Sequence, residues 1–201
     1  MNLNTPGTLF ILFLTVGVSL TGLYAKPGLI DASLFRPYYL VRRKQYHTLI
    51  TSGLVHVSGS HLLFNMLTFY FFGPPLERVI GTVRFVALYA VSLILSEART
   101  YLQHRNEPRY ASLGASGAIS AVLFAAIVYF PTQSLIILPI PVPIPAPLFA
   151  VGYLAYNWYL SRRGQDNVNH TAHIDGAVTG LLFVAVTDPA AYQRLLSLIA
   201  L

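Results

Sequence analysis

The sequence predicts an all-α membrane protein: a single bundle of six transmembrane helices with a long, membrane-associated first loop. Composition is the first indication, because 55% of the 201 residues are hydrophobic, only 10% are charged, and the mean hydropathy is +0.59. These values lie well outside the averages of soluble domains. The second indication is a series of apolar segments whose lengths approach the roughly 20 residues that a membrane span requires.

Six apolar segments follow one another along the chain, and we treat residues 1–201 as one domain. The predicted helices cover residues 8–24, 60–76, 79–98, 115–130, 148–161 and 172–187. The first segment has no basic region before it and five more follow, so we expect it to be a span and not a cleaved signal peptide. With their loops the six helices occupy the whole length, which leaves no room for a soluble domain.

Two of the connections have a marked composition. The first, residues 25–60, mixes basic residues with aromatic ones, including Phe35-Arg36-Pro37-Tyr38-Tyr39. We expect it to fold against the membrane surface with its aromatic rings at headgroup level. The second is an alternating proline run, 139–147. Proline excludes helix and favours polyproline II, so this run should end the fourth helix and delay the fifth.

Charge and cysteine content limit the partners and the chemistry. The net charge is +6, but the basic residues are scattered among short loops, which fits a lipid bilayer with anionic headgroups and not a nucleic acid. The chain has no cysteine, so disulfide and thiolate chemistry are excluded. His170, His173 and His61 could bind zinc, but no cysteine or suitably placed carboxylate completes a site. We therefore predict no metal and no cofactor.

Polar residues cluster where three of the predicted helices begin. His61 and Asn65 open the second helix, Ser116 opens the fourth between two glycines, and His173 opens the sixth. Because helix direction alternates across a membrane, these three starts must lie on the same face. His61 and Asn65 are four residues apart and hence on one side of their helix.

Small residues indicate that the fourth and sixth helices touch. Gly117, Ala121 and Ala125 recur every four residues in one helix, and Gly176 and Gly180 form a GxxxG pair in the other. Such pairs let membrane helices approach backbone to backbone. His173 shares the face of its two glycines, so its imidazole could reach the Ser116 hydroxyl at about 2.6–3.2 Å. Taken alone, Ser116 is better explained as a small packing residue in this helix contact; His173 and the His61–Asn65 pair are what favour a functional role.

At these residues the chain resembles the rhomboid family of intramembrane serine proteases. The motifs that carry the resemblance are His61-x-x-x-Asn65, Gly114-x-Ser116-Gly117 and Ala172-His173-x-x-Gly176-x-x-x-Gly180, in the family's order. The resemblance implies that Ser116 is the nucleophile and His173 its general base and later acid. It implies that Asn65, His61 and the backbone N–H of Ser116 form the oxyanion hole, and that His56 is a structural histidine of the first loop.

The sequence departs from the family pattern at two places near the site. His47-Thr48 stands where many rhomboids carry Trp-Arg, so the anchoring of the first loop should differ. Ser120 stands where an aromatic residue often stacks on the histidine, so His173 is held less firmly or by a hydrogen bond to Ser120. Asp175 lies about 200° round the helix from His173, which leaves a Ser–His dyad without a third member.

The predicted function is serine-type endopeptidase activity on transmembrane protein substrates, cleaved near the membrane surface through an acyl-enzyme. A Ser–His pair with oxyanion donors is the chemistry that amide hydrolysis requires. The alternative is a non-proteolytic rhomboid-like adaptor or chaperone that binds membrane helices. A small transporter is a third option, but the chain lacks paired discontinuous helices and buried charges.

Two arguments disagree about orientation. Ten basic residues fall in loops on the predicted active-site face and three, Arg78, Arg84 and Arg194, on the opposite face. The positive-inside rule would then place the site in the cytoplasm. The resemblance implies a cell (inner) membrane protein whose active site opens to the extracytoplasmic side. We adopt that orientation because half of the ten charges lie in the first loop, and charges that fold into the membrane interface are poor signals of topology.

Overall fold

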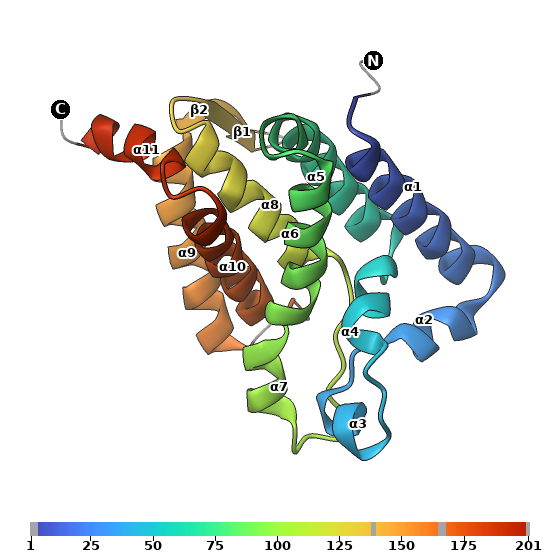
Figure 1. Cartoon of the computed structure of the whole chain (residues 1–201). Coiled ribbons are helices and arrows are strands. Elements are labelled where there is room, and N and C mark those ends of the chain that lie inside the picture. The colour runs from blue at the N-terminus through green and yellow to red at the C-terminus, as the bar shows by residue number, and fades with distance from the viewer. Residues whose placement is uncertain (1–3, 138–139, 165–167, 200–201) are drawn as a thin grey trace.

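The computed structural model describes residues 4–137, 140–164 and 168–199, which form a mostly helical bundle (Figure 1). Six of its helices have fourteen or more residues. They are α1 (Pro6–Leu20), α5 (Gly59–Ile80), α6 (Thr82–Leu95), α8 (Ser116–Tyr129), α9 (Ala146–Arg163) and α10 (His170–Thr187). Each overlaps one of the six predicted segments. Helix α1 continues as a π-helical turn, Thr21–Ala25.

The number of membrane spans stays a prediction. By length and composition, two helical stretches of the described residues could cross a membrane: Pro6–Ala25 and Thr82–His104. Helix α10 passes the same test only together with α11 (Ala191–Ile199), across a bend of 114°. Helix α8 is apolar but shorter, at 14 residues.

Short helices build the connections at one end of the molecule. The first loop contains α2 (Pro27–Ser33), α3 (Pro37–Arg42), α4 (Thr48–Thr51) and a 3₁₀ turn (Ser52–Leu54), while α7 (Ala98–His104) follows α6. Proline begins α2 and α3, which is favourable because the first helical N–H has no partner within the helix. His47-Thr48, the pair that departs from the family pattern, lies at the start of α4, where the Thr48 hydroxyl donates to the Gln45 carbonyl.

The opposite end carries a β-hairpin of strands β1 (Ser134–Ile137) and β2 (Ile140–Pro145). The prediction of polyproline II for the proline run is wrong for the residues of β2, which pair antiparallel with β1; Pro139 lies outside the described residues. Pairing is possible because only every second residue of β2 is a proline, so Ile144 keeps an N–H that can face Leu135 across the ladder.

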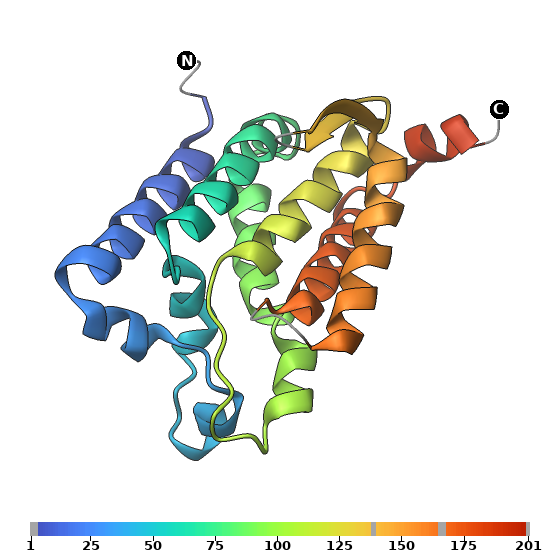
Figure 2. The same ribbon diagram turned by 180° about the vertical axis from the view of Figure 1, so that it is seen from behind.

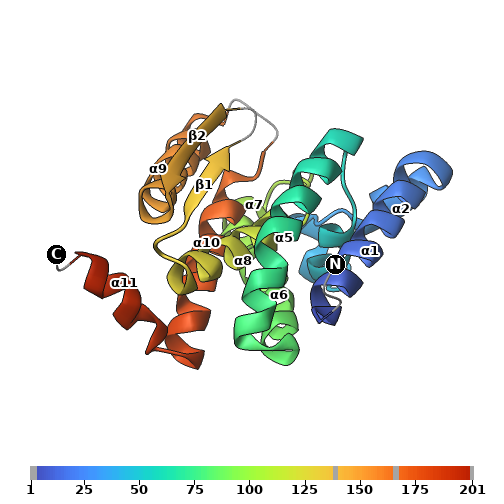
Figure 3. The same ribbon diagram turned by 90° about the horizontal axis from the view of Figure 1, so that it is seen from above.

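Helix α8 forms the centre of the bundle, between α10 on one side and α5 and α6 on the other (Figure 3). All of its residues from Gly117 to Tyr129 are buried. Helix α10 lies so close that a Cβ added at Gly176 would be 2.0 Å from the Gly117 carbonyl oxygen, and one at Gly180 would be 2.2 Å from that of Ala121. The GxxxG pair thus lets the backbones of α8 and α10 pack directly against each other, as the small residues predict.

A buried carboxylate joins the first helix to the end of α5. Glu77 accepts hydrogen bonds from the backbone N–H groups of Gly7 (2.8 Å) and Thr8 (2.7 Å), and from the hydroxyls of Thr8 (2.6 Å) and Thr82 (2.8 Å). The N–H groups of a first helical turn have no partner within their helix, and the helix dipole favours negative charge there. Glu77 therefore fixes α1 against α5 and α6.

Candidate active site

Ser116 is the first residue of α8, at the end of a long segment that rises from α7 (Figure 2). The segment is anchored by a hydrogen bond from the Gly114 N–H to the Ser52 carbonyl, 2.9 Å long. Gly114 has a φ of +112°, a conformation that side chains strongly disfavour. As the residue that opens the helix, Ser116 has a backbone N–H with no partner within α8.

The structure brings Ser116 and His173 into direct contact. His173 lies in the first turn of α10, and its Nε2 is 2.8 Å from the Ser116 Oγ. Asn169 caps this helix by accepting the Ala172 N–H at 3.0 Å. The distance lies within the range expected of a nucleophile and its base, and the contact occurs where Gly176 brings α10 onto α8.

A third side chain, which sequence reasoning missed, contacts the second ring nitrogen of His173. The Nδ1 of His173 lies 2.8 Å from the Asn157 Oδ1. His170 approaches the same oxygen through its own Nδ1, also at 2.8 Å. The sequence does carry a signal for it. Tyr153 and Asn157 are polar residues four positions apart in the fifth apolar segment, and hence on one side of a helix.

Of the two alternatives that the sequence leaves for Ser120, the structure does not support a hydrogen bond to His173. The Ser120 hydroxyl lies 2.8 Å from the Ser116 carbonyl and 2.7 Å from the Tyr153 hydroxyl. The ring of Tyr153 stacks against that of His173, with centroids 6.3 Å apart and planes inclined by 29°. The aromatic partner of the histidine therefore comes from α9, and the small Ser120 leaves room for it.

His61 and Asn65 lie on α5 beside the segment that leads to Ser116. A Cβ added at Gly114 would be 2.8 Å from the His61 Cε1, so glycine at that position permits the imidazole to approach the backbone. The Asn65 amide is buried and donates to the His61 carbonyl, 3.0 Å away. Both side chains thus come from the first two turns of the helix that packs against α8.

His56 is fully buried in the loop before α5. Its Nδ1 lies 2.9 Å from the Ser19 hydroxyl, which in turn donates to the Leu54 carbonyl, and its ring meets that of His61 edge to face. Burial, with a smaller contribution from His61, lowers the pKa of His56 to about 3. A ring that stays neutral at physiological pH fits a structural position between α1 and α5.

Charged side chains near the site pair elsewhere. Asp175 forms an ion pair with Arg99 of α7 and faces away from His173, as its position on the helix predicts. Within the described ranges, no group of three or more His, Cys, Asp or Glu side chains is placed to hold a metal ion.

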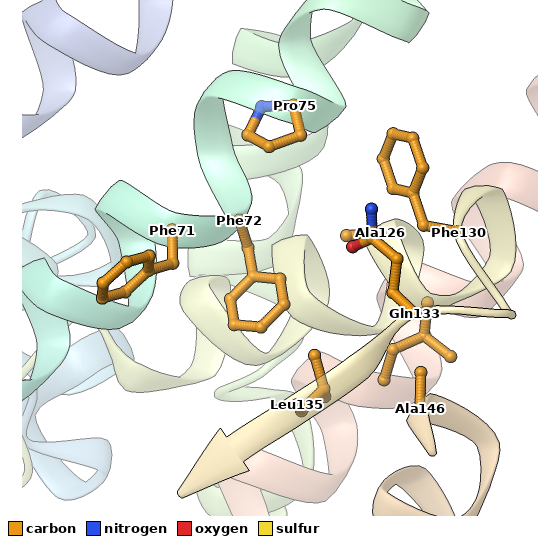
Figure 4. Close-up of a pocket in the computed structure, with 9 residues that line it drawn as sticks. Phe71, Phe72, Pro75, Ala126, Phe130, Gln133, Leu135 and Ala146 are labelled. Carbon is orange, nitrogen blue, oxygen red and sulfur yellow. The ribbon is translucent and has the colours of Figure 1, made fainter. Parts of the chain in front are cut away.

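An apolar pocket at the hairpin end is separate from this cluster. Figure 4 shows Phe71, Phe72 and Pro75 of α5 on one side, and residues from the end of α8, from β1 and from the start of α9 on the other. Gln133 is the polar residue among its lining. None of the lining residues belongs to the Ser116 cluster.

Comparison with known proteins shows the family to which the sequence belongs. The model of the Rhomboid domain matches residues 43–189. This chain therefore belongs to the rhomboid family, whose members are integral membrane proteins, and the predicted resemblance is confirmed.

Several relatives are bacterial or mitochondrial. The protein is 42% identical to YdcA of Bacillus subtilis over 80 residues, 39% of each chain. It is 26% identical to the rhomboid protease GlpG of Haemophilus influenzae over 162 residues, 73% of this chain and 72% of GlpG. It is 29% identical to the mitochondrial rhomboid protein 1 of Saccharomyces cerevisiae over 186 residues, 89% of this chain but 53% of the yeast protein. The chain thus spans about half or less of the length of several of its relatives.

Proposed function

We propose that this protein is an intramembrane serine endopeptidase in which Ser116 is the nucleophile and His173 the general base. The observation that carries the proposal is the 2.8 Å contact between the Ser116 Oγ and the His173 Nε2, where the first turns of α8 and α10 lie against each other. A serine hydroxyl is a weak nucleophile unless an adjacent base takes its proton. Family membership adds support, since relatives such as GlpG are named as proteases.

The reaction follows from the two side chains. As the Ser116 Oγ attacks the scissile carbonyl carbon, its proton passes to the His173 Nε2 and the carbonyl oxygen becomes an oxyanion. The imidazolium then protonates the leaving amine while the C–N bond breaks, which leaves an acyl-enzyme. Water, deprotonated by His173, attacks the ester; the C–Oγ bond breaks, and the Ser116 Oγ recovers a proton.

We assign the oxyanion donors to three groups: the Asn65 amide, the His61 ring and the backbone N–H of Ser116. Asn65 and His61 come from the start of α5, and the Ser116 N–H from the start of α8. Such donors stabilise the tetrahedral intermediate because they are already oriented where negative charge develops. The close approach of His61 to Gly114 supports this assignment.

The substrates that we propose are transmembrane proteins, cleaved near the point where their helices enter the bilayer. In this proposal all six long helices span the membrane and the site opens to water at the end that carries α2, α3 and α7. We assign the lateral gate for the substrate helix to α9, because much of its surface is exposed and its buried residues are limited to Ala146 and Asn157.

The proposal is tested with purified protein in liposomes, by cleavage of a transmembrane substrate and by fluorophosphonate labelling. Ser116→Ala should abolish both, and His173→Ala should reduce both to background, because the two groups act as one unit. Ser161→Ala is the matched control, because this hydroxyl is exposed and donates to the Trp158 carbonyl within its own helix, α9. Wild-type protein that binds membrane helices but neither cleaves nor labels would instead indicate an adaptor.

A further inference from the structure

The amide of Asn157 has one orientation that its surroundings allow. Its Nδ2 lies 2.9 Å from the Tyr153 carbonyl oxygen, which can only accept a hydrogen bond. The amide nitrogen must therefore face Tyr153, and the amide oxygen must face the two histidines. Rotating the amide by 180° would bring two acceptor oxygens together and is unfavourable.

This orientation determines where the histidine protons lie. The Asn157 Oδ1 is only an acceptor, so at 2.8 Å the Nδ1 atoms of His173 and His170 must both donate to it. A neutral imidazole carries one proton. With that proton on Nδ1, the Nε2 of His173 is an acceptor, and it faces the Ser116 hydroxyl at 2.8 Å.

We propose that Asn157 is a positioning residue of the active site, which holds His173 in the tautomer and ring orientation that let it accept the Ser116 proton. The inference rests on the proposed function. It gives the site a third member, supplied by α9, where the sequence predicts a dyad. The amide oxygen also faces the Nδ1–H of the imidazolium that forms during the reaction, so the contact persists through proton transfer.

The burial of α9 supports this assignment. Most of the helix is exposed or partly exposed, including Tyr156, Trp158 and Tyr159. Asn157 is nevertheless 2% exposed and lies on the side that packs on α10. A buried amide costs free energy unless its groups are satisfied, and here both of its polar atoms find partners.

The test compares three residues of similar size at position 157. Asn157→Asp retains an acceptor oxygen for His173, whereas Asn157→Leu fills the space with no acceptor. We expect the leucine variant to lose about 10²-fold or more in kcat, within the range that general base catalysis supplies, with KM unchanged. The rate constant of fluorophosphonate labelling should fall in parallel, because it reports on activation of Ser116 without a protein substrate. Asn157→Asp should retain most of both rates.

A purely structural role predicts the reverse order. Leucine packs well in a membrane helix, whereas a buried aspartate is costly, so Asn157→Leu would then be the more active and the more stable variant. Thermal unfolding measured alongside identifies a variant that does not fold. If the leucine variant does not fold, the rates of the aspartate variant distinguish the positioning role from the structural one. A folded Asn157→Asp with the labelling rate of His173→Ala would overturn the inference, as would a folded Asn157→Leu with wild-type rates.

The outcomes separate this inference from the proposed function. If wild-type protein shows no cleavage or labelling that depends on Ser116, the proposed function fails and position 157 has no rate to alter. If activity depends on Ser116 and His173 but not on the acceptor at 157, the dyad stands alone and only the inference fails.

Discussion

The side chain of Asn65 is held by its own helix, through the hydrogen bond from its Nδ2 to the His61 carbonyl. An amide has two N–H bonds, so one remains to be directed toward an oxyanion. We predict that Asn65→Ala lowers kcat by about 10²–10³-fold, the usual cost of one oxyanion donor, with little change in KM.

Asn65→Asp is the size-matched variant for this measurement, because an ionised carboxylate cannot donate. It should be at least as impaired as Asn65→Ala. A wild-type kcat in either folded variant would mean that His61 and the Ser116 N–H are sufficient.

Single residues were predictable from the sequence where helix direction and spacing were enough. The contact of Ser116 with His173 follows from the parity of the helices and from Gly176, so the expected distance agrees with the structure. Asn157 was missed, because the rotation of α9 about its axis depends on packing against α10. The roles assigned to Ser116, His173, Asn65 and His61 remain predictions that the kinetic experiments test.

The close contact between α8 and α10 predicts that a large side chain at Gly176 destabilises the protein. In Gly176→Leu the new side chain would collide with backbone, the Gly117 carbonyl, which cannot move aside as a side chain can. We expect a loss of about 1–3 kcal/mol or more in unfolding free energy and a loss of cleavage, because separation of the helices breaks the Ser116–His173 hydrogen bond.

Gly17→Leu is the matched control for Gly176→Leu, since a Cβ at Gly17 of α1 meets no atom within 4 Å. Thermal unfolding in detergent and cleavage in liposomes measure the two effects. Full activity in Gly176→Leu would show that this glycine does not set the helix spacing.

The connection of α1 to α5 through Glu77 predicts that loss of the carboxylate lowers the stability of the protein. Glu77→Gln retains the size of the side chain but replaces one acceptor oxygen with a donor that faces other donors. We expect a loss of about 1–3 kcal/mol in unfolding free energy, the cost of leaving a buried group unsatisfied. Below the unfolding temperature the cleavage rate should change little, because Glu77 lies at the other end of α5 from Asn65.

Glu107→Gln removes an exposed carboxylate near α7 and serves as the control, with unchanged stability expected. Equal unfolding temperatures for Glu77→Gln and wild type would contradict the role that the structure gives to Glu77.

At the level of elements, the six long helices were predictable because apolar runs of their length are stable as helices. Their ends were less so: α5 continues through Pro74 and Pro75 to Ile80, beyond the predicted residue 76. The hairpin was missed because polyproline II and extended strand lie close together in backbone conformation, and only pairing with β1 selects between them.

For the whole molecule, the distribution of cations is the feature that bears on orientation. Arginines at the end that carries α3 and the last turn of α9 lie over aromatic rings: Arg42 over Tyr38, Arg43 over Tyr39, Arg162 over Trp158 and Arg163 over Tyr159. Arginine and aromatic residues are typical of the headgroup region. If the first loop folds into the membrane interface, as the sequence predicts, Arg42 and Arg43 are poor signals of topology. For this reason we keep the prediction that the active site opens to the extracytoplasmic side.

The orientation is tested by single cysteines in this cysteine-free chain. Ser161→Cys and Thr132→Cys both replace an exposed hydroxyl with a thiol, the first near the end of α9 and the second in the turn between α8 and β1, at opposite ends of the molecule. We avoid Gly164, whose φ of +57° disfavours a side chain.

We predict that a membrane-impermeant thiol reagent added to intact cells labels Ser161→Cys and leaves Thr132→Cys unlabelled. Disruption of the membrane, which should expose both thiols, is the control. The reverse pattern would place the active site in the cytoplasm and reassign the compartment of the cleavage products. The catalytic proposal would be unaffected.

The proline pattern of β2 has a consequence for how chains meet one another. The Ala146 N–H donates to the Gln133 carbonyl, so at this point the backbone N–H faces β1. Ile144 lies two residues before Ala146 and therefore also directs its N–H toward β1. Pro143 and Pro145 occupy the alternate positions, which face outward. That outer edge offers carbonyl oxygens but no N–H at these residues, whereas a further strand would require both. An apolar segment of this kind would otherwise be able to recruit identical segments into cross-β stacks. Here the ladder cannot grow past two strands on that side, which protects the hairpin from aggregation while the protein is synthesised and inserted.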